Sequence, residues 1–214
     1  MPLRDVVIFP HVVMPLLVGR AASLAALDTA AADDSLVLLV AQKRADTEEP
    51  GSTDLFRVGV IARILQISRL QNGTTRVLVE SLARAKVTRY AMAGSHLKAN
   101  VQPYPLDATP LSEDEERQTR RAVASFEEYV ALHRRLPDEV VRLIGGAESF
   151  EQQACLMAAH LNVKLEVRQR LLEIPDARRA VRPARDDPRR RSRAAPPRTE
   201  DRGRRPWCAV PEPA

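Results

Sequence analysis

The chain has 214 residues, of which 44% are hydrophobic, and a net charge of +5, so it is long and apolar enough for one or two domains with a core. The charge is uneven, because residues 175–214 hold 12 Arg against six acidic residues and leave residues 1–174 near −1. The composition therefore argues against a nucleic-acid or membrane surface on residues 1–174.

The first forty residues predict extended segments around a single helix. Val6–Phe9 reads as a strand that Pro10 ends, because proline cannot donate a hydrogen bond to a sheet. Val12–Val18 continues as an extended apolar segment. Strong helix formers predict a helix over Ala21–Ala32, and the short apolar run Leu36–Ala41 is typical of a buried strand.

Two long runs rich in β-forming residues follow a polar loop. They cover Leu55–Leu70 and Thr74–Arg89, and Asn72 and Gly73 lie between them. Asn-Gly readily adopts the positive φ angles of a tight turn, so we expect a hairpin closed by a two-residue turn. Leu97–Val101 reads as one further strand.

The apolar period then changes to that of helices. Ser112 with Glu115, and Ser149 with Gln152, form capping boxes, in which the hydroxyl and the longer side chain bond main-chain amides at a helix start. Asn162 is expected to cap the last helix. Four helices are predicted, over residues 112–136, 137–145, 149–160 and 163–173.

These elements predict an α+β fold in three parts. Residues 1–105 form a strand-rich pseudo-barrel with one helix, and residues 111–174 form a small helical bundle. Residues 175–214 contain eight prolines and no Leu, Ile, Phe or Tyr, so we expect a disordered tail. An alternative for this tail is an Arg-rich arm that binds nucleic acid.

The residue patterns that carry catalysis or bind cofactors are missing from the sequence. No lysine follows a glycine, so there is no GxxxxGK[ST] phosphate-binding loop, and we expect neither an enzyme nor a cofactor. The acidic run Glu113–Glu116 is interpreted as helix capping rather than a metal site. Cys155 and Cys208 are interpreted as unpaired thiols. The histidines lack ligand spacing; they are His11, His96, His133 and His160.

The chain is expected to be soluble and cytoplasmic. Asp5 interrupts the apolar core that a secretory signal peptide needs. The longest apolar run, Val12–Val18, contains a proline and is too short to cross a bilayer.

Four segments in a fixed order resemble a known family. They are LRDVVIFPHVVMPLLVGR (3–20), LVLLVAQK (36–43), VGVIARILQI (58–67) and RVLVESLARA (76–85). Over residues 2–174 the chain resembles the N-terminal domain of the Lon family of ATP-dependent proteases. The resemblance implies a non-catalytic module that engages substrate polypeptides and helps to organise a hexamer. It also implies a truncated protease, because the Ser–Lys catalytic residues belong to a separate domain that has no counterpart here. The resemblance further suggests that residues 175–214 are an out-of-frame reading of a GC-rich gene, since a long helix begins at this point in the family.

The candidate binding residues for unfolded polypeptide are Val12, Val13, Met14, Leu16 and Leu17. One interpretation buries both faces of this segment, one in the barrel and one under the helix at 21–32. The other leaves an exposed apolar groove for extended polypeptide, with self-association also possible. The alternative function is nucleic-acid binding by the tail, which would weaken steeply with salt.

Overall fold

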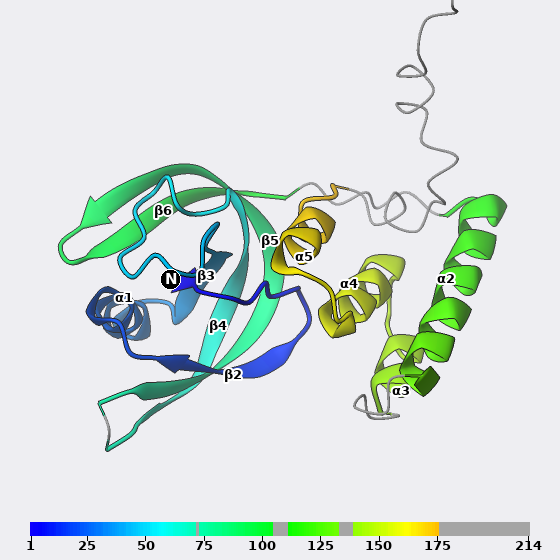
Figure 1. The fold of residues 1–214 in the computed structure, drawn as a ribbon, viewed down its shortest axis with the longest axis horizontal. Helices are drawn as coiled ribbons and strands as arrows, with labels where there is room; N and C mark the ends of the chain where they lie inside the picture. The colour runs from blue at the N-terminus through cyan, green and yellow to red at the C-terminus, as the bar shows by residue number, and fades with distance from the viewer. Residues whose placement is uncertain (72, 105–110, 133–138, 176–214) are drawn as a thin grey trace, which may run out of the picture. The chain divides into compact units, whose positions relative to one another are not determined.

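The computed structural model describes residues 1–71, 73–104, 111–132 and 139–175 (Figure 1). Strands and one helix come first and four helices follow, so the predicted α+β class is confirmed. The elements are β1 (Pro2–Leu3), β2 (Val13–Val18), α1 (Ala21–Ala32), β3 (Leu36–Ala41), β4 (Val58–Arg69), β5 (Thr75–Ala93), β6 (His96–Pro103), α2 (Glu113–Leu132), α3 (Glu139–Gly145), α4 (Phe150–His160) and α5 (Leu165–Leu172).

The strands form one curved sheet in the order β1-β3-β4-β5-β2, with β6 also paired to β5. Only β1 and β3 are parallel among the pairs described. The 19-residue β5 is long enough to pair with β2 and β4 in its first half and with β6 in its second. Bulges in β4 and β5 bend the sheet, which curls round in Figure 1.

The two end strands, β1 and β2, do not pair with each other in the described part of the chain. The barrel is therefore open along the seam between them. Its interior is filled by one apolar cluster, to which α1 contributes the almost fully buried Leu27. Leu16 and Val18 of β2 and Val77 and Val79 of β5 are among its other members.

The strand predicted over Val6–Phe9 is wrong, since these residues lie outside every strand of the sheet. Their side chains nevertheless alternate between two clusters. Val6 and Ile8 face the barrel interior, whereas Val7 and Phe9 join a second cluster with α4 and α5. The period-two pattern that suggested a strand thus arises from an unpaired extended segment between two cores.

The predicted hairpin between β4 and β5 is confirmed, but its turn is longer than the two residues expected. The Leu70 N–H donates to the Thr74 carbonyl (2.9 Å), and the Gly73 N–H donates to the Leu70 carbonyl (3.2 Å), so three residues lie between the last bonded pair, Leu70 and Thr74. Gly73 has φ 78°, which favours glycine. Asn72 lies outside the described residues.

Two of the three predicted helix caps are present. The Ser112 N–H donates to Glu115 Oε2 (3.0 Å) and the Glu115 N–H to Ser112 Oγ (3.4 Å). Ser149 Oγ accepts from the Gln152 N–H (3.2 Å). The prediction that Asn162 caps the last helix is wrong, because α5 begins after Lys164, which forms no side-chain cap. Residues 133–138, where the second helix was expected to start, lie outside the described residues.

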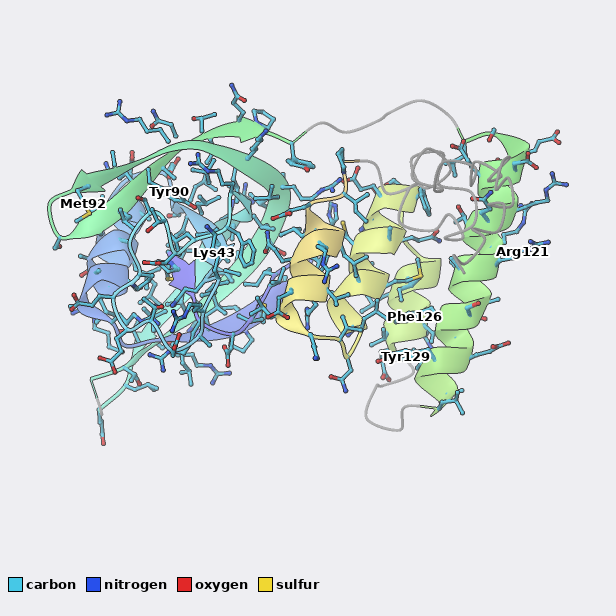
Figure 2. All side chains as sticks on the ribbon, turned by 45° about the horizontal axis from the view of Figure 1, so that its top comes forward. Lys43, Tyr90, Met92, Arg121, Phe126 and Tyr129 are labelled. Carbon is cyan, nitrogen blue, oxygen red and sulfur yellow. The ribbon has the colours of Figure 1, made fainter. Side chains whose placement is uncertain are left out.

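The helices have an apolar cluster of their own. Phe126 and Tyr129 of α2 pack with ring centroids 5.7 Å apart, and both lie on the side of α2 toward α4 in Figure 2, opposite Arg121. The cluster also contains Ile144 of α3 and Met157 of α4.

A buried arginine links the strands to the last helix. Arg84 of β5 is only 6% exposed, and its guanidinium donates to the carbonyls of Leu172 and Ile174 and to the carboxylate of Glu151. It also lies 5.0 Å from the centroid of the Tyr104 ring. A cation at the end of α5 satisfies carbonyls that the helix itself leaves unbonded.

Candidate functional site

The pleat of β2 divides the five candidate residues between different environments. Val13 and Leu17 are 56% and 74% exposed, whereas Leu16 is 8% exposed. Met14 is half-buried against the barrel interior, and Val12 is half-buried against the helical cluster. Successive side chains of a strand point to opposite faces, so one strand cannot present all five to a ligand.

The interpretation that buries both faces of β2 is wrong for the outward one. Helix α1 was expected to cover that face, but Leu27 of α1 shares the interior cluster with Leu16 and Val18. Val13 and Leu17 are left exposed on the other face. Among the candidates, only these two combine apolar side chains with substantial exposure.

Neighbouring side chains extend this exposed face across the sheet. Pro15 is exposed between Val13 and Leu17 and lies opposite the half-buried Leu78 of β5. Leu65, at a bulge in β4, is 48% exposed. Sequence reasoning missed Pro15, Leu65 and Leu78. The alternation of side chains along β2 could have indicated Pro15, but no signal in the sequence pointed to Leu65 or Leu78.

Charged side chains lie across the strands from the two exposed candidates. Arg76 of β5 lies opposite Leu17, and Glu80 lies opposite Val13. Glu80 forms an ion pair with Arg63 of β4 (3.5 Å). The face is thus a short apolar strip with ionic groups beside it.

A groove of about 610 Å³ runs along the open seam of the barrel. One wall is residues 1–6 and the other is β2 with the residues that follow it; Pro15 and Leu17 line it together with Arg4 and Asp5. The groove therefore lies beside the same strand that carries the exposed apolar side chains.

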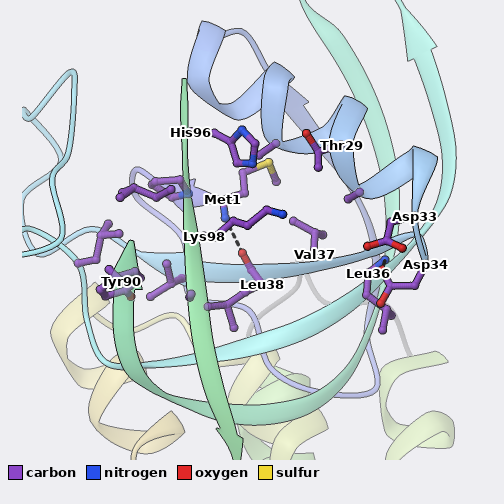
Figure 3. Close-up of a pocket in the computed structure, with 17 residues that line it drawn as sticks. Met1, Thr29, Asp33, Asp34, Leu36, Val37, Leu38, Tyr90, His96 and Lys98 are labelled. Carbon is purple, nitrogen blue, oxygen red and sulfur yellow. Dashed lines mark hydrogen bonds between the residues drawn. The ribbon is translucent and has the colours of Figure 1, made fainter. Parts of the chain in front are cut away.

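Two further cavities are lined in part by Met1 and Pro2. The first, of about 820 Å³, is lined by the start of α1, by residues 48–52 and by the exposed Met92 at the end of β5. The second, of about 210 Å³, lies between α1, β3 and β6 (Figure 3). There the Met1 amino group donates to the Leu38 carbonyl (2.6 Å), and burial lowers the pKa of this amine to about 5.

Burial shifts the pKa values of two side chains of reactive types, Cys155 and His160. Burial raises the pKa of the Cys155 thiol to about 11, which leaves it protonated and a poor nucleophile at neutral pH. Burial, and then the Arg168 charge, lower the pKa of His160. The described residues contain no group of three His, Cys, Asp or Glu side chains able to hold a metal ion. None of their helices is long and apolar enough to span a membrane.

Comparison with known proteins places this geometry in a family. The family model of the ATP-dependent protease La (LON) substrate-binding domain matches residues 1–184. The chain belongs to the Lon substrate-binding domain family. The match extends ten residues beyond the resemblance drawn from the sequence, which ended near residue 174.

Full-length Lon proteases are similar to the chain over most of its residues. The Lon protease of Escherichia coli K12 is 41% identical over 176 residues, which are 82% of this chain and 22% of that protein. The Lon protease of Vibrio parahaemolyticus is 42% identical over 178 residues, with the same two shares. The chain thus spans about a fifth of the length of these relatives, and the matched part is the substrate-binding domain, a non-catalytic module.

Solved Lon domains share the fold. The N-terminal domain of the Mycobacterium avium complex Lon protease superposes with a TM-score of 0.63 at 20% identity, covering 85% of this chain and 93% of that one. The Lon N-terminal domain protein from Xanthomonas campestris gives a TM-score of 0.54 at 15% identity, covering 84% and 90%.

Proposed function

We propose that this chain is a polypeptide-binding module that captures exposed apolar segments of unfolded proteins at β2. In a Lon protease it would recognise substrates and help to organise the hexamer, while separate modules hydrolyse ATP and cleave peptide bonds. The observation that carries the proposal is the exposure of Val13 and Leu17 beside the groove at the seam. Membership of the Lon substrate-binding family supports it.

The size of the site makes its affinity low. Burying an exposed Val or Leu side chain contributes roughly 1.5–3 kcal/mol. Two such residues contribute about 3–6 kcal/mol, which at best matches the low end of the cost of about 4–15 kcal/mol for losing translational and rotational freedom on association. A single module should therefore bind weakly, and several modules in one assembly would gain affinity by binding one substrate at several points.

A pair of double variants tests the proposal. Val13→Ser with Leu17→Ser should weaken binding of a reduced and alkylated, permanently unfolded protein by at least about ten-fold, because apolar contact is lost without disturbing the core. Leu132→Ser with Leu143→Ser is the matched control, since those leucines are 82% and 60% exposed but lie on α2 and α3.

Fluorescence anisotropy with the labelled unfolded protein measures both affinities, and thermal unfolding checks that each variant folds. Equal affinities for the Val13/Leu17 variant and the unmodified chain would refute the proposed site. Loss of binding in the control pair alone would move the site to the helices.

A further inference from the structure

We propose that the polypeptide binds as an added strand, paired through its main chain to the free edge of β2 in the seam between β1 and β2. This inference rests on the proposed function and specifies the ligand as an extended segment recognised by its backbone. Exposed peptide N–H and C=O groups occur in every unfolded chain, so such recognition does not depend on sequence.

The register shows which main-chain groups of β2 are available. The Ser81 N–H donates to the Val12 carbonyl (2.9 Å), and the pairing continues in register to Val18 opposite Thr75. In an antiparallel pair, alternate residues bond across to the partner strand, so residues 14, 16 and 18 bond to β5. The main chains of Val13, Pro15 and Leu17 consequently point away from β5, toward the seam.

The hairpin on the other side of β5 supports the same assignment. The Thr74 carbonyl accepts from Leu70, so even-numbered residues at that end of β5 face β4. Odd-numbered residues of β5 then face β2, as Ser81 does. In the described part of the chain, no residue bonds to the outward groups of Val13, Pro15 or Leu17.

Pro15 occupies the middle outward position, where its missing N–H costs the sheet nothing. Two N–H groups, of Val13 and Leu17, and three carbonyls remain for an incoming strand. A second copy of β2 is a poor partner, because antiparallel pairing about the centre would set one Pro15 against the other and lose the central bonds. A flexible segment with an N–H at every position can use all five groups, so an unfolded polypeptide is the occupant.

The dimensions of the groove at the seam fit an extended polypeptide. β2 is six residues long, so at about 3.3 Å per residue its edge measures about 20 Å. The groove of about 610 Å³ follows this edge, with Arg4 and Asp5 on the opposite wall. The exposed side chains of Val13 and Leu17 can contact those residues of the added strand that face outward from the sheet.

Backbone-modified peptides test the inference on the unmodified chain. The probe is a fluorescent peptide of about ten residues, the length of the edge plus short flanks, with alternating apolar and polar side chains that fix which face it presents. One version is N-methylated at the apolar positions and another at the polar positions. We expect one version to bind like the parent and the other about ten-fold more weakly, since only alternate N–H groups face β2.

The outcomes separate this inference from the proposed function. If both methylated versions bind like the parent peptide, strand addition is wrong but apolar capture at β2 stands. If both lose binding equally, the N–H groups are not used alternately and strand addition is again wrong. If the parent peptide and the unfolded protein do not bind at all, the proposed function itself fails.

A matched pair of substitutions gives an independent test. Leu17→Pro and Leu17→Val both keep an apolar side chain, but only the proline removes the outward N–H. Because that N–H is not part of the β2–β5 ladder, the proline variant should fold, which its melting temperature checks. We expect Leu17→Pro to weaken peptide binding about five-fold relative to Leu17→Val, as the loss of one hydrogen bond implies. Equal affinities would overturn the inference, and the peptide comparison decides it if the proline variant does not fold.

Discussion

Replacing Arg84 with Met should destabilise the domain more than most single substitutions. The methionine retains much of the apolar stem but removes every donor, together with the guanidinium that lies over the Tyr104 ring. The carbonyls of Leu172 and Ile174 then lose a charged partner. Glu151 also loses its ion pair, but its side chain is 24% exposed and can turn to solvent.

The structure sets the magnitude of this effect. A hydrogen bond to a charged group contributes about 1.5–3 kcal/mol, and a buried acceptor left without a partner costs about 1–3 kcal/mol. Leu172 is 2% exposed, so its carbonyl has little access to replacement water. Discounting Glu151 for its exposure, we expect a loss of about 3 kcal/mol of unfolding free energy, or roughly 6–12 °C in melting temperature for a chain of this size.

Urea unfolding of the full chain, followed by circular dichroism, measures the loss. Arg84→Lys should lose about half as much, because an ammonium reaches fewer of the fixed acceptors than a guanidinium. Glu151→Gln should lose least, since an amide oxygen still accepts from the guanidinium. A loss below about 1 kcal/mol for Arg84→Met would refute the argument that this side chain holds the end of α5 against β5.

Four other outcomes follow from the structure. Gly59→Ala should cost about 3 kcal/mol in urea unfolding, because its Cβ would lie 2.4 Å from the Leu39 carbonyl oxygen, whereas Gly145→Ala, with nothing within 4 Å, should be neutral or slightly stabilising. Gly73→Val should lower stability by about 1–2 kcal/mol through backbone strain alone, since φ is 78° and the added Cβ meets nothing within 4 Å. Burial raises the pKa of the Cys155 thiol from 9.0 to about 11. The contribution of this thiol to the unfolding free energy is therefore complete below pH 9 and is lost as the pH rises to 11. Over that window the unfolding free energy should fall less steeply with pH in Cys155→Ala than in the unmodified chain. Deleting residues 176–214, which keeps the carbonyls that Arg84 bonds, should leave the melting temperature unchanged and abolish any salt-sensitive binding to DNA, because the remaining residues are nearly neutral.

The parts of the fold that were predictable depend on neighbours in the chain. Ala21–Ala32 and Leu36–Ala41 have the bounds predicted for them, because helix formers and a continuous apolar run carry their signal locally. The capping box at Ser112 and Glu115 likewise needs only three residues of separation.

Other features depend on partners far away in the sequence. Val6–Phe9 alternates like a strand, but alternation specifies which faces are apolar and not whether another strand is available to pair. The bonds that Arg84 makes to Glu151 and Leu172 span 67 and 88 residues. No local pattern in β5 distinguishes that arginine from a solvated one.

The candidate site shows what could be predicted from local sequence and what could not. The sequence indicated that Val12–Leu17 is too apolar for one strand face, and strand alternation alone would have separated Val13 and Leu17 from Leu16. It could not show that β2 is an end strand, because that follows from the order of the strands, in which β2 pairs with β5 alone among the described strands.

Pro15 connects the architecture of the edge with its proposed use. In a central strand this proline would remove a ladder hydrogen bond, so its presence in β2 agrees with an edge position and with a main chain that points outward. An edge that carried N–H groups at all three outward positions would pair readily with other copies of itself. The proline removes the central donor and so disfavours such pairing, while the donors of Val13 and Leu17 on either side remain. A site that binds extended chains weakly and without sequence preference needs both the missing central donor and the two remaining ones. Its edge must stay open for unfolded polypeptide, but the protein must not aggregate through that edge.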